Sequence, residues 1–207
     1  MLLSAVQNAI FPPQYFSKKS SSVSLWNINE SNISQLQTLN SELFPVKYSP
    51  QFYENILNGE SFGLLATHDN QYVGAIVGRL QPYRFTEDFE GNFNRAGYHQ
   101  METYKRDVIC GYNYKEIYIM TLGVLSSHRR LGIGRALIDS IIEDSKKNKD
   151  IKKIVLHVQS SNSSALAFYK NYGFEVSKLV KEYYRLIPSP DAYILTLELK
   201  NRNKTPI

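Results

Sequence analysis

The spacing of apolar and polar positions along this chain predicts strands and helices that largely alternate. Residues 23–28 alternate with period two, which is typical of a strand that is buried on one face. Apolar positions in 33–43 recur at helical spacing after the cap residues Ser31 and Asn32, and that helix ends before Pro45. The same reasoning predicts strands at 62–66, 72–80, 117–124, 154–158, from 174 and at 192–197, and helices at 50–57, 132–147 and 163–172. This order predicts an α/β (mixed α+β) fold, with a mixed central sheet flanked by helices.

Three stretches lie outside that pattern. Residues 81–115 are polar, aromatic and weakly periodic, and we interpret them as a partly ordered insertion that could include extensions of the flanking strands. Residues 1–22 lack arginine and contain Pro12 and Pro13, so we interpret them as an N-terminal extension rather than a transit peptide. We therefore expect one domain over 23–200, followed by a polar tail at 201–207.

Composition narrows the classes of function. The chain of 207 residues has one cysteine, Cys110, so neither an intramolecular disulfide nor a multi-cysteine zinc site can form within it. We expect no metal. The net charge of +5 favours acidic ligands, but no zinc finger, long basic stripe or RNP-like motif suggests direct DNA binding. No apolar run approaches the length of a membrane span, so we expect no membrane association.

Residues 129–135 carry two glycines and three arginines between a predicted strand and a predicted helix. Backbone N–H groups at a helix N-terminus attract an anion, and glycine lets the backbone approach it closely. The spacing fits neither a P-loop nor a dinucleotide fingerprint. Arg-x-x-Gly-x-Gly between a strand and a helix instead resembles the acyl-CoA signature of the GNAT N-acetyltransferases. The alternative is a helix start with incidental glycines.

Further motifs resemble the catalytic subunit of the NatE-type N-alpha-acetyltransferases, the San family. They lie in residues 43–48, 118–124, 156–159, 162, 168–169 and 182–184. The resemblance covers roughly 23–200, apart from the 81–115 insertion. It implies a GNAT fold with a mixed sheet splayed at its centre, with acetyl-CoA as cosubstrate.

The resemblance also implies the reaction: acetyl transfer to the N-terminal α-amine of proteins, with a preference for a retained Met followed by an apolar residue. Lysine acetylation would be a secondary activity. Implied partners are a NatA-type acetyltransferase complex and the ribosome. We expect the protein in the cytoplasm, with the nucleus as a further location.

Tyr118 and His157 occupy positions that resemble the family's catalytic pair, where they would hold a water that accepts the amine proton. A core histidine bonded to a backbone carbonyl is the alternative for His157. Tyr169 resembles the tyrosine beside the CoA sulfur, where its phenol would donate to the departing thiolate, although its ring could simply pack the helix on the sheet. Because Cys110 lies in the insertion, we expect direct attack on the thioester rather than an acetyl-enzyme.

The resemblance assigns two further sets of residues. Some of these residues also have a purely structural alternative to ligand binding. Leu122 and Val124 could form strand core, Asn162 a helix cap, Phe44–Val46 a plug over the core, and Arg79 a salt bridge. Cofactor-binding residues would be Met120, Leu122, Val124, Arg129, Arg130, Leu131, Gly132, Ile133, Gly134, Arg135, Asn162 and Tyr169. Substrate-binding residues would be Phe44, Pro45, Val46, Tyr48, Arg79, Met120, Tyr183 and Tyr184.

The sequence is also compatible with two other functions. Golgi-type N-alpha-acetyltransferases share much of the pattern and carry a membrane-binding C-terminal segment, whereas residues 200–207 here are polar and would not anchor. A non-catalytic supporting subunit of a ribosome-bound acetyltransferase complex is the second alternative. The retained glycines, Tyr118, His157 and Tyr169 favour an active enzyme.

Overall fold

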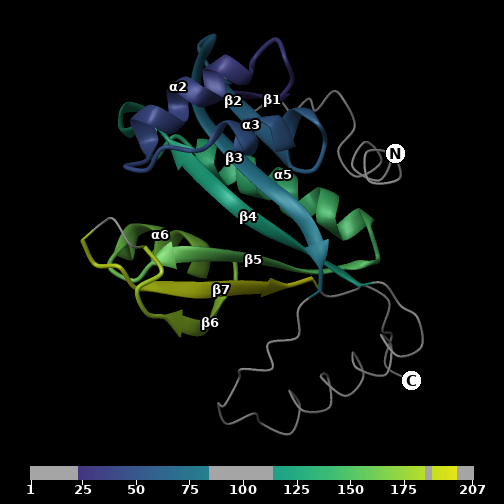
Figure 1. The fold of residues 1–207 in the computed structure, drawn as a ribbon, viewed down its shortest axis with the longest axis vertical. Coiled ribbons are helices and arrows are strands. Elements are labelled where there is room, and N and C mark those ends of the chain that lie inside the picture. The colour runs from purple at the N-terminus through teal and green to yellow at the C-terminus, as the bar shows by residue number, and fades with distance from the viewer. Residues whose placement is uncertain (1–22, 84–113, 185–187, 200–207) are drawn as a thin grey trace, which may run out of the picture. The chain divides into compact units, whose positions relative to one another are not determined.

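The computed structural model describes residues 23–83, 114–184 and 188–199, and Figure 1 shows their course. All predicted helices and strands are present in the predicted order, and the structure adds one short 3₁₀ helix, η1. The elements are β1 Val23–Asn27, α2 Ile33–Leu43, α3 Pro50–Leu57, β2 Phe62–His68, β3 Gln71–Pro82, β4 Lys115–Val124, η1 Ser126–His128, α5 Ile133–Lys147, β5 Ile151–Gln159, α6 Ser163–Lys170, β6 Glu175–Val180 and β7 Ala192–Glu198.

The strands form a seven-stranded mixed sheet in the order β1-β2-β3-β4-β5-β7-β6, which confirms the predicted fold class. The described residues fall into two compact units. The first unit contains 23–80 and 118–148, and the second contains 81–83, 114–117, 149–184 and 188–199.

In the first unit, β1, β2 and β3 form an antiparallel meander. The connection between β2 and β3 is the two-residue turn Asp69-Asn70, and both residues have positive φ, at 49° and 62°. This conformation suits a tight hairpin because its twist matches that of the flanking strands, and Asn and Asp tolerate it better than most residues do. The predicted hairpin is therefore confirmed.

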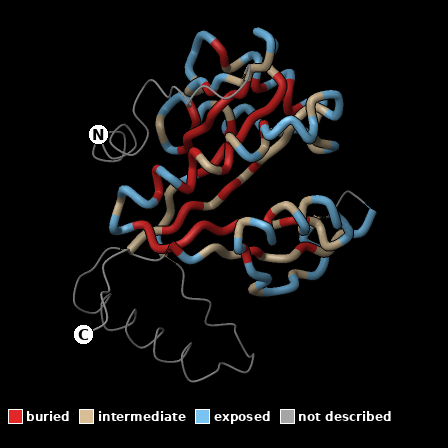
Figure 2. Tube along the Cα trace, turned by 180° about the vertical axis from the view of Figure 1, so that it is seen from behind, coloured by how far each residue is buried: buried red, intermediate tan, exposed pale blue. Residues whose placement is uncertain are grey.

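Two helical layers bury this sheet. Figure 2 shows the result as long runs of buried positions through the strands of the first unit. On one side, α2 and α3 pack on β2 and β3 through Leu36, Leu39, Phe52, Ile56, Leu65, Ala75 and Val77. On the other side, α5 contributes fully buried side chains that include Ile133, Leu137, Ile138 and Ile141.

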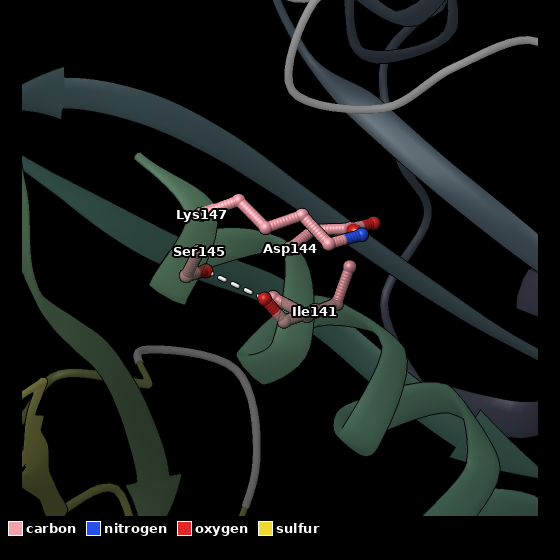
Figure 3. Close-up of polar contacts among 4 residues, drawn as sticks. All are labelled: Ile141, Asp144, Ser145 and Lys147. Atoms are coloured by element: carbon pink, nitrogen blue, oxygen red, sulfur yellow. Dashed lines mark hydrogen bonds and ion pairs between the residues drawn. The ribbon is translucent and has the colours of Figure 1, made fainter. Parts of the chain in front are cut away.

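The C-terminal half of α5 also buries polar groups (Figure 3). The Ser145 hydroxyl donates to the Ile141 carbonyl at 2.6 Å. Asp144 has a fully buried side chain, and Lys147 Nζ donates to its carboxylate at 2.5 Å while remaining largely exposed. Because a buried carboxylate is costly unless it is paired, Lys147 compensates Asp144 while its own charge remains at the surface.

In the second unit, β7 lies between β5 and β6 and pairs antiparallel with both. Asn162 caps α6, since its side-chain oxygen accepts from the Ala165 N–H at 3.0 Å. The helix ends at Lys170, two residues before the predicted end. Gly173, three residues further on, has φ of 84°, and its N–H donates to the Lys170 carbonyl at 2.9 Å, so the predicted glycine closes the turn after the helix.

A buried ionic cluster lies where β3 ends and β4 begins, at the edges of the described segments. Lys153 Nζ lies 3.2 Å from the Glu116 carboxylate and 4.2 Å from the centre of the Tyr83 ring. Gln81 donates to Glu116 at 2.6 Å. The Tyr83 N–H donates to the Tyr114 carbonyl at 3.0 Å, which joins the two strand ends. The rest of the predicted insertion, 84–113, lies outside the described residues, as do 1–22 and 200–207.

Candidate functional site

The predicted anion-binding loop lies between η1 and α5 in the first unit. Gly132 is the N-cap residue of α5 and has φ of 81°, a conformation that glycine adopts without strain. A Cβ built on Gly132 would meet nothing within 4 Å, so the space beside this backbone is open. The first amides of α5 have no acceptor within the helix, and the helix dipole adds partial positive charge there. The geometry suits a bound anion.

The loop's side chains divide into exposed cations and one core residue. Arg129, Arg130 and Arg135 are exposed, and Arg130 has a positive φ of 67°. Arg129 Nε donates to the Val124 carbonyl at 3.2 Å, which ties it to the end of β4. Ile133 is buried in the core, so only its backbone is available to a ligand. The remaining predicted loop residues, Leu131 and Gly134, are exposed and half-buried respectively.

Strand β4 places several candidates in a row within the first unit. Tyr118 is half-buried, and the Arg79 guanidinium carbon lies 5.2 Å from the centre of its ring. Arg79 therefore makes a cation–π contact with the predicted catalytic tyrosine, and neither side chain should be considered alone. Met120 packs against the core shared with α2 and α3, and its sulfur accepts from the Ser61 hydroxyl at 3.9 Å.

Further along β4, Leu122 and Val124 are half-buried. Their half-buried state fits both a ligand-facing backbone and a role in the strand core, so their binding role stays a prediction.

The segment after α2 carries the predicted peptide-binding side chains. Phe44 and Tyr48 meet edge to face at 5.9 Å, and Tyr48 packs on Phe52 of α3 at 4.5 Å. The Phe44 ring also lies against β4, because a Cβ added to Gly123 would come within 3.1 Å of it. Pro45 is exposed and Val46 is half-buried. These contacts bring the segment close to β4 within the first unit.

In the second unit, three predicted site residues form one aromatic cluster. The His157 ring is stacked on Tyr183, with centroids 4.2 Å apart and planes 10° apart. Tyr183 meets Tyr184 edge to face at 4.8 Å. Burial lowers the pKa of His157 below its usual 6.5, so the ring is neutral near pH 7. A neutral imidazole can accept a proton.

Tyr169 is almost fully buried between Phe168 and Phe174. Burial, and secondly the nearby Tyr184, raises the pKa of the Tyr169 phenol well above 10. The phenol therefore remains a hydrogen-bond donor at neutral pH. For Asn162, the capping bond in α6 accounts for its position, and a contact with CoA stays a prediction.

Two residues that were not predicted as site residues hold the Tyr183–Tyr184 turn. Gln159 Nε2 donates to the Pro188 carbonyl at 2.6 Å and to the Ser189 carbonyl at 3.0 Å. Asp191 Oδ1 accepts from the Glu182 N–H at 2.9 Å. The three bonds join positions 29, 30 and 9 residues apart in sequence, so apolar periodicity does not identify them. The one sequence signal was that Gln159 lies in the motif 156–159, which carries the family resemblance.

Tyr118 belongs to the first unit and His157 to the second, so their action as a pair stays a prediction. No three His, Cys, Asp or Glu side chains among the described residues gather as metal ligands would. None of the helices in the described ranges is both long enough and apolar enough to cross a membrane.

Comparison with known proteins places these features in context. Residues 28–174 match the Acetyltransferase (GNAT) family. The chain is 34% identical over 180 residues to the "Probable N-acetyltransferase san" of Drosophila melanogaster, covering 87% of this chain and 83% of that protein. It is 33% identical over 179 residues to N-alpha-acetyltransferase 50 of Danio rerio, covering 86% and 90%.

The fold is also similar to that of a solved structure, "Arabidopsis thaliana Naa50 in complex with bisubstrate analogue CoA-Ac-MVNAL". The TM-score is 0.66 at 31% sequence identity, and the match covers 85% of this chain and 98% of that chain.

Proposed function

Because this chain belongs to the acetyltransferase (GNAT) family, we propose that it transfers the acetyl group of acetyl-CoA to the N-terminal α-amine of proteins. One observation carries this proposal. The sequence is 34% identical to san and 33% identical to N-alpha-acetyltransferase 50, and each match covers more than 80% of both proteins. These relatives confirm the NatE-type resemblance, and the family match confirms the GNAT fold.

The loop before α5 fits the diphosphate of acetyl-CoA. Its open space beside Gly132 leaves room for phosphate oxygens to approach the backbone amides. Arg129, Arg130 and Arg135 are exposed nearby in sequence and supply charge of the opposite sign. We assign to this loop the role of holding the cosubstrate, with no metal in the reaction.

Transfer to an α-amine requires a neutral nucleophile. The solution pKa of an α-amine is near 8, so modest assistance is enough. We assign proton acceptance to neutral His157 through an ordered water, together with Tyr118 as the resemblance predicts. The amine nitrogen bonds to the thioester carbonyl carbon, the amine proton passes to that water, and the C–S bond then breaks.

The departing thiolate needs a proton donor or a hydrogen bond. Tyr169 suits this role because burial keeps its phenol protonated. Its packing between Phe168 and Phe174 fixes the ring, so the hydroxyl is held in one position. Packing and catalysis are therefore compatible for this residue.

We further propose that the enzyme prefers a retained Met followed by an apolar residue. An apolar pocket that includes Phe44, Pro45 and Val46 would take the Met side chain, and each methylene in such a pocket is worth about 1–3 kcal/mol of discrimination. Tyr183 and Tyr184 would bind the peptide backbone, while Arg79 and Met120 would border the pocket. Lysine acetylation is proposed as a secondary activity.

The cellular setting is also a proposal. The resemblance suggests assembly with a NatA-type acetyltransferase complex at the ribosome, in the cytoplasm and also the nucleus. The net charge of +5 is compatible with approach to ribosomal RNA.

Initial rates on three matched peptides test the activity. One peptide begins Met-Leu, the second lacks the Met, and the third has a blocked N-terminus and an internal lysine. The proposal predicts the highest kcat/KM for the Met-Leu peptide, with a loss of at least about a hundredfold in His157→Gln, as is typical when a general base is removed. Turnover of the blocked lysine peptide alone would reject α-amine transfer as the function.

A further inference from the structure

The stack of His157 on Tyr183 depends on a turn whose backbone is held from two sides. Tyr183 is one of the more exposed large side chains and comes from the connection between β6 and β7, not from a strand. An exposed ring in a connection has many alternative positions unless the backbone around it is fixed. Its near-parallel position at 4.2 Å from His157 therefore needs a structural cause.

One cause is Asp191, the residue before β7. Glu182 has a left-handed backbone with φ of 54°, which is unfavourable for a residue with a long side chain. Asp191 Oδ1 accepts from the Glu182 N–H at 2.9 Å, and this bond stabilises the bend directly before Tyr183. The Asp191 backbone is fixed in turn, because its carbonyl accepts from the Ser160 N–H at 2.8 Å.

The second cause is Gln159, on the same strand face as His157 and two residues further along β5. Its amide nitrogen donates to the Pro188 and Ser189 carbonyls, at 2.6 and 3.0 Å. Ser189 also has a left-handed backbone, with φ of 58°. The following residue, Pro190, accepts from the Tyr184 N–H at 2.8 Å, so the two arms of the turn are joined.

We infer that Gln159 and Asp191 are positioning residues that hold the Tyr183–Tyr184 turn over the His157 ring, an inference that rests on the proposed function. Gln159 anchors the arm that leads into β7, at Pro188 and Ser189, to the strand that carries His157. Asp191 anchors the arm that follows β6, at Glu182. Together they fix the peptide-binding tyrosines relative to the general base. We assign neither residue a contact with the reacting atoms.

The variants Asp191→Ala, Asp191→Asn and Gln159→Ala test this inference. Asp191→Asn removes the charge but keeps an oxygen that can accept from the Glu182 N–H, so it is the matched control. The first readout needs no substrate: the NMR shift of the His157 Hε1 proton, assigned by its absence in His157→Gln. A ring stacked at 4.2 Å shifts such a proton away from its solvent-exposed position through the ring current. The second readout is the separate KM for peptide and for acetyl-CoA.

We expect Asp191→Ala and Gln159→Ala to move the His157 signal toward its solvent-exposed position. We also expect each of them to raise the peptide KM about tenfold, the scale of the one hydrogen bond lost in Asp191→Ala and the two lost in Gln159→Ala, with the acetyl-CoA KM unchanged. Asp191→Asn should match the wild type in both readouts.

An unmoved His157 signal in both alanine variants would overturn the inference, as would an Asp191→Asn variant as impaired as Asp191→Ala. If the wild type failed to acetylate any α-amine, the proposed function would fall, while the NMR comparison would still decide whether the two residues hold the stack.

Discussion

The buried pair Glu116–Lys153 offers the sharpest test of the packing described for the second unit. The two side chains are 3% and 6% exposed, and their charged atoms lie 3.2 Å apart. At an effective dielectric constant of about 20, that separation corresponds to an attraction of about 5 kcal/mol. Desolvation of both ions offsets most of it, so the intact pair contributes little net stability.

Removal of one partner has a larger effect, because it takes away the nearest opposite charge from an ion that stays buried. Such a change typically costs about 3–5 kcal/mol. In Glu116→Gln, the Tyr83 ring at 4.2 Å still contacts Lys153, and Glu198 on the paired strand β7 still attracts its charge, so we expect the lower end, about 3 kcal/mol. Lys153→Met should cost a similar amount, because it leaves the Glu116 carboxylate buried. The double variant Glu116→Gln/Lys153→Met should cost less than the sum of the single variants by about 2 kcal/mol.

Urea unfolding followed by far-UV circular dichroism measures these differences in the free energy of unfolding. The exposed Glu143→Gln is the matched control and should lie within about 0.5 kcal/mol of the wild type. A Glu116→Gln variant within about 1 kcal/mol of the wild type, or additive single variants, would show that the pair is not buried and coupled as described.

Three further predictions concern the helix, the site and the loop. Lys147→Met should lower the free energy of unfolding in urea by about 1–2 kcal/mol, because it leaves the buried Asp144 carboxylate without its ion pair. The loss is smaller than for a fully buried pair because Lys147 is 64% exposed. The exposed Lys146→Met is the control and should have little effect. Burial lowers the folded-state pKa of His157 below 6.5, so as the pH falls below about 7 the unfolded chain takes up the proton first. The free energy of unfolding of the wild type should therefore fall more steeply with decreasing pH than that of His157→Gln. Equal slopes of stability against pH would contradict the lowered pKa. Gly132→Ala should lower the free energy of unfolding by about 1–2 kcal/mol, because Gly132 has φ of 81°, which is unfavourable for alanine. It should also raise the KM for acetyl-CoA. An unchanged KM would show that this glycine does not belong to the anion site.

The order and type of the main elements could be predicted from the sequence, because their apolar spacing and end signals are local. Strand β5 shows where that reasoning stops. It was predicted to start at 154, but it starts at Ile151. The prediction was late because Lys152 and Lys153 interrupt the apolar pattern, although both are buried in the strand. Nothing adjacent in sequence explains a buried lysine: Glu116 and Tyr83, the partners of Lys153, are 37 or more positions away. The 3₁₀ helix η1 was missed because three residues carry no periodicity.

The candidate site shows the same division. The glycine of the anion loop and the cap at Asn162 follow from local rules, and the structure gives both the expected geometry. The stack of His157 on Tyr183 could not be predicted, because it depends on a connection fixed by Gln159 and Asp191. These contacts form only once β5, β6 and β7 have paired.

The most direct measurement of the central claim is the position of the acetyl group on a peptide that offers both kinds of amine. A peptide beginning Met-Leu, with one internal lysine and a free N-terminus, is incubated with acetyl-CoA and the wild-type enzyme, and the product is mapped by tandem mass spectrometry. The account predicts one acetyl group per peptide, predominantly on the α-amine of Met. It also predicts that this acetylated product is lost with the His157→Gln variant. An acetyl group found predominantly on the lysine side chain would contradict it.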